Sequence, residues 1–558
     1  MRRLLAILCC YVVASMVSVQ ANEPVAAIND NNVTPTVPAS TEITQTEADT
    51  VSVEGLLVTL TKVKLSKALP VLKQLEKVGG AQILPMFESM LAGDLYFVKS
   101  SKEVVAVTKV NGEITAQAIL TQQSLGQLDS SLVKKIRVNN KLRGYLRQAI
   151  ARLQISNSDP AIRLDAVKAL LKNLSDETVA TLTSVRPNEG DEDVLSMIDL
   201  ALALNQSNSA IAHERLAAVK VLADSLENEA RNKLTKLADN DSDAKVKAAA
   251  SKALKSINQR IEFYGFIDQL FFGLSLGSVL LLAAIGLAIT FGVMGVINMA
   301  HGEMIMLGAY TTYVVQLMMP NAIEYSLWVA IPMAFLVSGL VGVLIERGVI
   351  RHLHGRPLET LLATFGISLI LQQLVRTVFS PLNRQVASPE WISGSLEINP
   401  ILSLTLNRLY ILAFALLVFG LLLIVLRKTS LGLNVRAVSQ NRDMAKAMGI
   451  KTDWVDAMTF GLGSGIAGIA GVALSQLTNV GPNLGQAYII DSFMVVVFGG
   501  VGNLWGTLVA AFSLGIANKF LEPVTGAVLA SIIVLVFIIL FIQKRPKGLF
   551  PQKGRAAE

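Results

Sequence analysis

The chain has 558 residues, of which 52% are hydrophobic and 16% charged, and its formal net charge is +7. From about Phe266 onward the apolar residues form runs near the roughly 20 residues that a helix needs to cross hydrocarbon. Much of the Lys and Arg in this half lies in short loops between those runs, which is the pattern of cytoplasmic loops and not of a nucleic-acid-binding surface. The composition therefore excludes a wholly water-soluble protein and gives no reason to expect nucleic acid as a partner.

The first 21 residues have the pattern of a secretory signal. Two arginines follow Met1, an apolar run covers 4–17, and a small-residue cleavage pattern ends at Ala21. A retained anchor is the alternative, and both place the following segment outside the cytoplasm. The two cysteines, Cys9 and Cys10, lie within this signal. Cleavage would therefore leave no thiol for a disulfide, a metal site or catalysis.

The segment after the signal divides into a linker and a folded domain. Residues 22–50 are rich in Thr, Pro, Ala, Asn and Glu, so we expect a flexible linker. Residues 51–259 have mostly helical periodicity and are expected to form a periplasmic domain. One β-hairpin is expected there, with strands at 95–98 and 104–107 on either side of a polar turn.

An internal repeat lies within this domain. The segment 163–170 recurs almost unchanged at 215–222, and a looser third copy covers 243–254. Apolar positions at helical spacing with small alanines suit stacked helical hairpins, and the segment resembles HEAT repeats. An unrelated helical bundle is the alternative. Neither predicts chemistry, and we expect no cofactor and no metal site, since His213 has no partner at ligand spacing.

Residues 260–543 are expected to form nine membrane spans. The linkers 346–356 and 427–453 and the tail 544–558 are rich in Lys and Arg, whereas 477–488 carries none. Positively charged loops stay in the cytoplasm, so the C-terminus is expected there, and nine spans then place the N-terminus outside, in agreement with the signal. The expected fold is all-α: a polytopic helical membrane bundle preceded by a mostly helical, HEAT-like soluble domain. The spans are centred near Leu280, Leu307, Phe335, Leu369, Leu417, Gly465, Val496, Ala511 and Leu535.

Polar residues between the first two expected spans are candidates for a solute path. Asn298, His301 and Glu303 have no Lys or Arg nearby. Ionisable groups at membrane depth are costly, and they usually pair with one another or line a cavity. A capped helix break that shapes the bundle is the alternative.

The fourth expected span adds a second polar group. Thr364, Ser368, Gln372 and Gln373 place hydroxyl and amide groups within it. Hydrogen bonds between helices and the lining of a pore both explain such residues. We therefore count Thr364, Ser368 and Gln372 among the candidates for the path.

Two glycine-rich runs predict close packing and a break. Small residues over 461–471 would let helix backbones approach closely in lipid. The run 499–506 has too many glycines for a stable helix, and it indicates a tight turn or a re-entrant break. Asn503 lies in this second run and is a further candidate for the path.

Residues 434–452 form a basic segment that is too long for a tight turn. A helical stretch is expected over 442–448, ended by a glycine that accepts the left-handed cap conformation. Its apolar residues at i, i+3 and i+4 share one face, which suits docking in a groove on a partner. A solvated surface loop is the alternative. The residues assigned to docking are Arg436, Arg442, Met444, Ala445, Ala447, Met448 and Gly449.

From about residue 265 to 550 the chain resembles permease subunits of the branched-chain amino-acid type of ATP-binding-cassette importers. The resemblance lies in five ordered motifs: 298–303, Ile345-Glu346-Arg347 with Arg356-Pro357, 436–450, the turn near Gly499, and 545–549. Within that family, the chain is most similar in sequence to the urea-transporting subgroup, whose members can carry a long N-terminal extension. This similarity lies at 485–493, 502–506 and 518–523. Met299 and Trp505 depart from the amino-acid-transporting members.

The resemblance implies a set of partners. These are a second permease subunit in a heterodimer, two cytoplasmic ATPase subunits, and a periplasmic solute-binding protein. The resemblance also implies that the helical stretch at 442–448 is the helix that couples this chain to an ATPase. The resemblance also implies an inner-membrane location in the lipid bilayer. The chain contains no Gly-Lys dipeptide and so has no phosphate-binding P-loop. It is therefore expected to be a transport subunit and not an enzyme, with ATP hydrolysed by the partners.

The leading expectation is ATP-driven import of a small polar solute, with urea first and a branched-chain amino acid or short amide as the alternative. An ion-coupled carrier or channel would need a relay of ionisable groups across several spans, and only His301 and Glu303 resemble one. A membrane-embedded hydrolase would need a nucleophile with a base or a metal pair. His352 and His354 lie instead in an arginine-rich loop.

Overall fold

The computed structural model describes two compact units, Met1–Asn139 and Asn140–Glu558. The expected signal at 1–21 and linker at 22–50 lie outside the described residues, as do the last eight residues of the expected tail. The described residues are 52–550, apart from 111, 112, 121, 122, 128, 130, 131 and 354.

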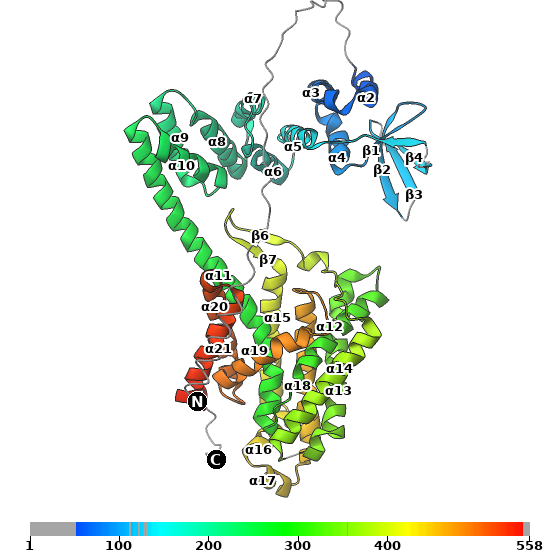
Figure 1. Cartoon of the computed structure of the whole chain (residues 1–558), viewed down its shortest axis with the longest axis vertical. Coiled ribbons are helices and arrows are strands. Elements are labelled where there is room, and N and C mark those ends of the chain that lie inside the picture. The colour runs from blue at the N-terminus through cyan, green and yellow to red at the C-terminus, as the bar shows by residue number, and fades with distance from the viewer. Residues whose placement is uncertain are drawn as a thin grey trace, which may run out of the picture. The chain divides into compact units, whose positions relative to one another are not determined.

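The first unit joins short helices to a five-stranded antiparallel sheet (Figure 1). The predicted hairpin is confirmed, because β1 and β2 pair with Phe97 opposite Val104. The other strands were not predicted. They are short and partly polar, and they extend the sheet in the order β4-β3-β2-β1-β5. The elements are α2 (Val53–Lys62), α3 (Ala68–Gly79), α4 (Leu84–Ala92), β1 (Leu95–Val98), β2 (Val104–Val110), β3 (Glu113–Ala118), β4 (Ser124–Gln127) and β5 (Val133–Lys135).

The second unit begins with an array of helices that contains the internal repeat. Its first two copies fold alike. Arg163 forms an ion pair with Glu189 and Arg215 forms one with Asp241, both at 2.7 Å. Each arginine also donates to the backbone carbonyl six residues before it. The helices are α5 (Asn140–Gln154), α6 (Pro160–Leu171), α7 (Asp176–Val185), α8 (Glu192–Gln206), α9 (Ala212–Asp224) and α10 (Asn228–Asn240).

The array and the membrane bundle share one helix. α11 (Ala244–Met294) runs for 51 residues without a break. Its first turns bury Val246 and Ile257 in the core of the array, and its later turns lie in the core of the bundle. The expected limit between 51–259 and 260–543 falls inside this helix. The domain limits therefore stay a prediction.

The predicted helical membrane bundle is confirmed, and each of the nine predicted centres lies in a helix (Figure 1). Among the described residues, seven helices are long and apolar enough to cross a membrane. The number of nine spans is not confirmed, because α19 has only 16 residues and α12, which begins with His301 and Glu303 in its first turn, is not among the seven. The helices after α11 are α12 (His301–Met318), α13 (Ile323–Gly348), α14 (Pro357–Phe379), α15 (Leu406–Lys428), α16 (Ser430–Gln440), α17 (Arg442–Ala447), α18 (Thr452–Ser475), α19 (Leu484–Gly499), α20 (Leu504–Thr525) and α21 (Ala527–Lys544), with a small hairpin of β6 (Ser395–Glu397) and β7 (Ser403–Thr405) before α15.

The glycines at 461–471 let other helices pack closely on α18, as predicted. A Cβ added to Gly308 of α12 would lie 2.0 Å from the carbonyl oxygen of Gly468. A Cβ added to Gly286 of α11 would lie 2.3 Å from the carbonyl oxygen of Gly463. Because no side chain fits at these crossings, the glycines fix the separation of α11, α12 and α18.

The predicted break at 499–506 is confirmed as a tight turn between α19 and α20. Gly500 has φ +104° and Gly502 has φ +79°, values that favour glycine. The helix ends come so close that a Cβ on Gly506 would lie 2.1 Å from the carbonyl oxygen of Gly499. The turn therefore depends on glycine both for its conformation and for its packing.

Candidate functional site

α12 begins inside the bundle. The left-handed residue Gly295 (φ +68°) ends α11, and the chain then turns back among the spans. The Nε2 atom of His301 donates to the carbonyl of Ala283 at 2.8 Å. Ala283 lies about 16 Å back along α11 from Met294, at 1.5 Å per residue. The N-terminus of α12, whose free N–H groups favour negative charge, therefore lies in the apolar core.

A buried carboxylate occupies the first turn of α12. Glu303 is 1% exposed, and its Oε1 accepts hydrogen bonds from Ser368 at 2.9 Å and Gln372 at 2.8 Å. One turn earlier on α14, the hydroxyl of Thr364 accepts from the N–H of Met299 at 3.2 Å. One polar side of α14 therefore binds the start of α12. We define the Glu303 cluster as Asn298, His301, Glu303, Thr364, Ser368 and Gln372.

The sequence predicted all six members of the Glu303 cluster, and the structure brings them together. Asn298 is buried, and its Oδ1 accepts from the N–H of Ala300 at 3.0 Å, which stabilises the break before α12. Of the two explanations for the polar residues of α14, hydrogen bonds between helices account for Gln372. The neighbouring Gln373, about 100° further around α14, is exposed.

Three buried polar atoms on α12 have no hydrogen-bond partner among the described residues: Nδ1 of His301, Oε2 of Glu303 and the hydroxyl of Tyr310. Buried polar atoms are nearly always paired, so such a group requires an explanation. A polar solute that carries N–H donors would satisfy the carboxylate oxygen. Sequence reasoning missed Tyr310, although its position seven residues after Glu303 places both on one face of the helix.

Asn503 does not join the Glu303 cluster. Its Oδ1 accepts from the N–H groups of Trp505 and Gly506, so the side chain caps α20. Its Nδ2 donates to the carbonyl of Phe550 at 3.1 Å. These bonds give Asn503 a structural role in holding the C-terminal segment at the α19–α20 turn, and its place on the path stays a prediction.

The helix predicted over 442–448 is present as α17. Gly449, with φ +88°, follows the C-cap residue Met448, as expected for a left-handed cap. Met444, Ala447 and Met448 are all exposed, so no described residue covers the predicted apolar face. The geometry fits a docking helix.

Three residues assigned to docking hold α17 and α16 in place. Ala445 is buried against Val435 in a small core, so it lies on the inner side of α17 and not on the exposed face. Arg442 forms an ion pair with the buried Asp456 on α18. Arg436 donates to a carbonyl at the end of α15. The structure corrects the assignment of Ala445 to docking, because this residue lies off the face formed by Met444, Ala447 and Met448 and packs inward.

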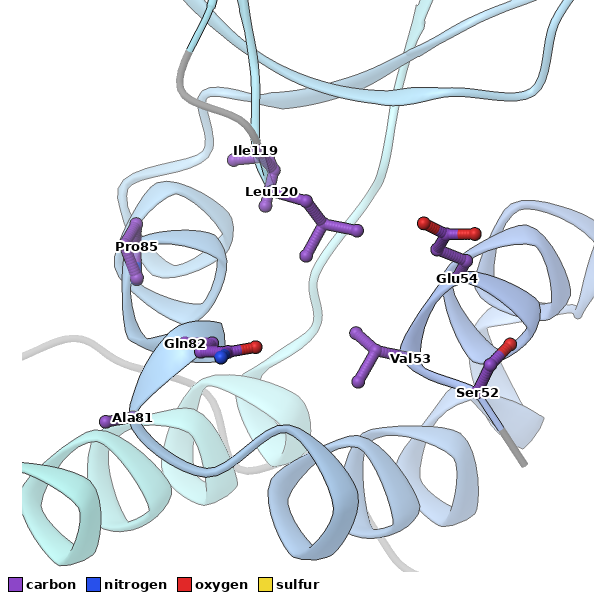
Figure 2. A pocket seen from close by; sticks show the side chains of 8 residues that line it. All are labelled: Ser52, Val53, Glu54, Ala81, Gln82, Pro85, Ile119 and Leu120. Atoms are coloured by element: carbon purple, nitrogen blue, oxygen red, sulfur yellow. The ribbon is translucent and has the colours of Figure 1, made fainter. Parts of the chain in front are cut away.

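A hollow of about 750 Å³ lies in the first unit, between α2, the turn before α4 and the end of β3 (Figure 2). Glu54 is its one ionisable side chain, and Ser52 caps α2. No cluster of His, Cys, Asp or Glu within 52–550, as far as these residues are described, could hold a metal ion. We assign no function to the hollow. Its lining is Ser52, Val53, Glu54, Ala81, Gln82, Pro85, Ile119 and Leu120.

Comparisons with known proteins match the bundle. Residues 269–542 match the family described as branched-chain amino acid transport system / permease component. The chain is 31% identical over 300 residues to the high-affinity branched-chain amino acid transport system permease protein LivH of Salmonella typhimurium, covering 52% of this chain and 96% of the relative. It is 29% identical over 299 residues to BraD of Pseudomonas aeruginosa, with the same coverage. It is 32% identical over 113 residues to the ribose import permease protein RbsC of Bacillus subtilis, covering 19% of this chain and 35% of the relative. No solved structure matches the chain.

Proposed function

This chain belongs to the family of branched-chain amino acid transport permeases, and we propose that it lines half of the solute path in an ATP-driven importer. Its membrane-spanning helices and its relatives make it a multi-pass inner-membrane transport subunit. The observation that carries the proposal is that the family match covers 269–542, the part of the chain that forms the bundle from α11 to α21.

We propose that partners supply the energy and the solute. The chain has no P-loop lysine, so two ATPase subunits would hydrolyse ATP on the cytoplasmic side. The exposed apolar face of α17 supports the docking of one of them on this chain. A second permease subunit would complete the path, and a periplasmic binding protein would deliver the solute.

The Glu303 cluster is the proposed contact for the solute. It lies among the membrane-spanning helices, it is buried, and it includes a carboxylate oxygen without a hydrogen-bond partner among the described residues. α14 supplies three of its members and has its other side exposed. A small movement of α14 away from α12 would therefore open the cluster and leave the closely packed α11–α12–α18 crossings unchanged.

The relatives favour a branched-chain amino acid as the solute, because LivH and BraD are named for that transport. Urea is the second candidate. The segment 485–493 is similar in sequence to the urea-transporting subgroup. It forms the start of α19, which packs directly against the start of α12. A Cβ on Gly485 would lie 1.8 Å from the carbonyl oxygen of Gly302. Both solutes present N–H donors that the free oxygen of Glu303 could accept.

Uptake of labelled leucine and labelled urea tests the proposal. Cells that lack their own uptake systems would express the chain together with its partner subunits. Saturable leucine uptake that a large excess of urea does not reduce would support a branched-chain amino acid. The reverse result would support urea. Uptake of neither solute, in cells that contain the assembled complex, would contradict both assignments.

We propose that the helical array at 140–260 and the unit before it lie in the periplasm, and that the array is HEAT-like. The basic loops at 346–356 and 427–453 support this orientation. An impermeant thiol reagent added to spheroplasts should label Ser184→Cys in α7 and should not label Lys428→Cys at the end of α15. Labelling of Lys428→Cys without labelling of Ser184→Cys would contradict the proposed topology.

A further inference from the structure

A basic groove of about 460 Å³ lies where α13 ends and α18 begins, beside α17. Its lining carries four cations, Arg347, Arg351, Lys446 and Lys451, against the single carboxylate of Asp453. Arg351 pairs with Asp453 at 2.5 Å. Among the described residues, the other three cations form no ion pair. The groove therefore presents a net positive charge to any group that enters it.

An exposed tryptophan forms part of the same groove. Trp454, in the first turn of α18, is 55% exposed, and the guanidinium of Arg347 lies 5.2 Å from its ring centroid. This contact orients the arginine and leaves its donors free for an anion. Tryptophans at the ends of spans lie at the level of the lipid headgroups. The groove is therefore at the depth where lipid phosphates lie.

Apolar side chains continue from the groove along the spans. Leu340 and Leu344 are exposed on α13, seven and three residues before Arg347, so they share its face. Met458 is exposed on α18, four residues after Trp454. A free phosphate or an acidic peptide would use the cations but not this apolar stripe. A phospholipid would use both.

We propose that this groove binds an anionic phospholipid, with its phosphate among Arg347, Lys446 and Lys451 and its acyl chains along Leu340, Leu344 and Met458. Basic pockets between membrane helices suit such headgroups. The inference goes beyond the proposed function and does not require transport. The side of the membrane on which the lipid lies rests on the topology proposed above. Because Lys446 belongs to α17, a lipid in the groove would also hold α17 against α18.

Fluorescence quenching by brominated lipids tests the proposal. The full chain would be placed in phosphatidylcholine nanodiscs containing a fraction of phosphatidylglycerol, with bromine on the acyl chains of one lipid or the other. The chain has four tryptophans, so the signal that disappears in Trp454→Phe reports the groove. We expect brominated phosphatidylglycerol to quench this signal at lower mole fraction than brominated phosphatidylcholine.

Charge variants then assign the preference to the groove. The double variant Arg347→Gln, Lys451→Gln should weaken the apparent affinity for phosphatidylglycerol by roughly tenfold or more. Arg347→Lys, Lys451→Arg keeps both charges and should retain the preference. Lys428→Gln removes a cation at the end of α15, outside the groove lining, and should behave as wild type.

Three results would overturn the proposal. One is equal quenching by both brominated lipids in the wild-type chain. Another is loss of the lipid preference on addition of millimolar inorganic phosphate or ATP, which would identify a site for a soluble anion. The third is unchanged lipid preference in the Arg347→Gln, Lys451→Gln variant together with weaker ATPase co-purification. That outcome would assign the groove to the ATPase.

Discussion

The carboxylate of Glu303 lies in the apolar core because three features compensate for its burial. Ser368 and Gln372 donate to one oxygen, and the first turn of α12 favours negative charge. The other oxygen has no partner among the described residues. The free oxygen supports the proposed contact with a polar solute, because buried polar atoms are nearly always paired.

Two neighbouring glutamines provide a matched test of this site. Gln372 donates to Glu303, whereas Gln373, the next residue of α14, is exposed. A hydrogen bond to a charged group contributes about 1.5–3 kcal/mol, so we expect Gln372→Ala to lower uptake at limiting solute by roughly tenfold or more. Gln373→Ala should retain most of the uptake. Membrane insertion and assembly are measured in parallel, and equal losses from both variants would contradict the role of the cluster.

The buried pair of Arg215 and Asp241 predicts a pH effect in the array. The hydrogen bond from Arg215 holds the pKa of the Asp241 carboxyl below its usual value. A lowered folded-state pKa means that the pair stabilises the array above the unfolded pKa of about 4 and that this stability is lost as the pH falls through the folded value. We expect the hydrogen-exchange protection of α9 and α10, corrected for intrinsic rates, to fall below about pH 4.

Variants separate this effect from general acid unfolding. Arg215→Gln should already lower the hydrogen-exchange protection of α9 and α10 at pH 7. On acidification, this protection should fall less in the variant than in the wild-type chain. The pair of Arg186 with Asp199 has the same chemistry, but its side chains are 48% and 35% exposed. Exposed pairs contribute little, so Arg186→Gln should have a much smaller effect. If the two variants behave alike, the Arg215 pair does not stabilise the repeat.

Single residues were predictable from sequence where their type is unusual for their surroundings. Asn298, His301 and Glu303 stand out because polar groups are costly at membrane depth. Tyr310 did not stand out, since tyrosine is common in spans and its unpaired hydroxyl is visible only when its neighbours are known. Ala445 was assigned to docking although it lies off the face that helical spacing gives to Met444, Ala447 and Met448, and the structure buries it.

At the scale of elements, the crossings on α18 depend on glycine. A methyl group on Gly308 would lie 2.0 Å from the carbonyl oxygen of Gly468, and this neighbour is backbone that cannot rotate away. Overpacking of this kind costs on the order of 1–3 kcal/mol, so we expect Gly308→Ala to lower the unfolding temperature of the solubilised chain. Gly366→Ala in α14 adds a Cβ with nothing within 4 Å and should leave that temperature unchanged or raised. Equal decreases would contradict this account of the packing.

Docking through α17 can be tested with two methionines of matched exposure. Met448 is 77% exposed after α17, and Met318 is 76% exposed at the end of α12. Met448→Asp places a charge on the apolar face, and we expect it to reduce ATPase co-purification and ATP-dependent uptake by about tenfold or more, the effect of losing a buried anchor. Met318→Asp should retain both. Full uptake and full association in Met448→Asp would show that α17 is not the docking helix.

Elements were predictable where one physical signal dominates them. Apolar runs located a helix at each predicted centre because the membrane requires long apolar segments. Strands β3 to β5 were missed because three to six partly polar residues carry little periodicity. The continuity of α11 was missed because composition changes near Phe266, although nothing there ends a helix.

At the scale of the whole molecule, the similarity to transport permeases lies in the bundle. Just over half of this chain, 52%, covers 96% of LivH, so the helical array and the unit before it are additions to what that relative contains. The sequence separated these regions by composition. It did not show that α11 serves both the array and the bundle, because that depends on packing at both ends of one helix.

ATP-driven transport is the central claim, and reconstituted uptake tests it most directly. The complex that co-purifies with the full chain would be placed in proteoliposomes, with labelled leucine and labelled urea supplied on the side of the binding protein. We expect accumulation of one solute with hydrolysable ATP on the ATPase side, none with a non-hydrolysable analogue, and no effect of an ionophore. Accumulation that follows an imposed ion gradient in the absence of ATP would contradict the account and identify a secondary carrier.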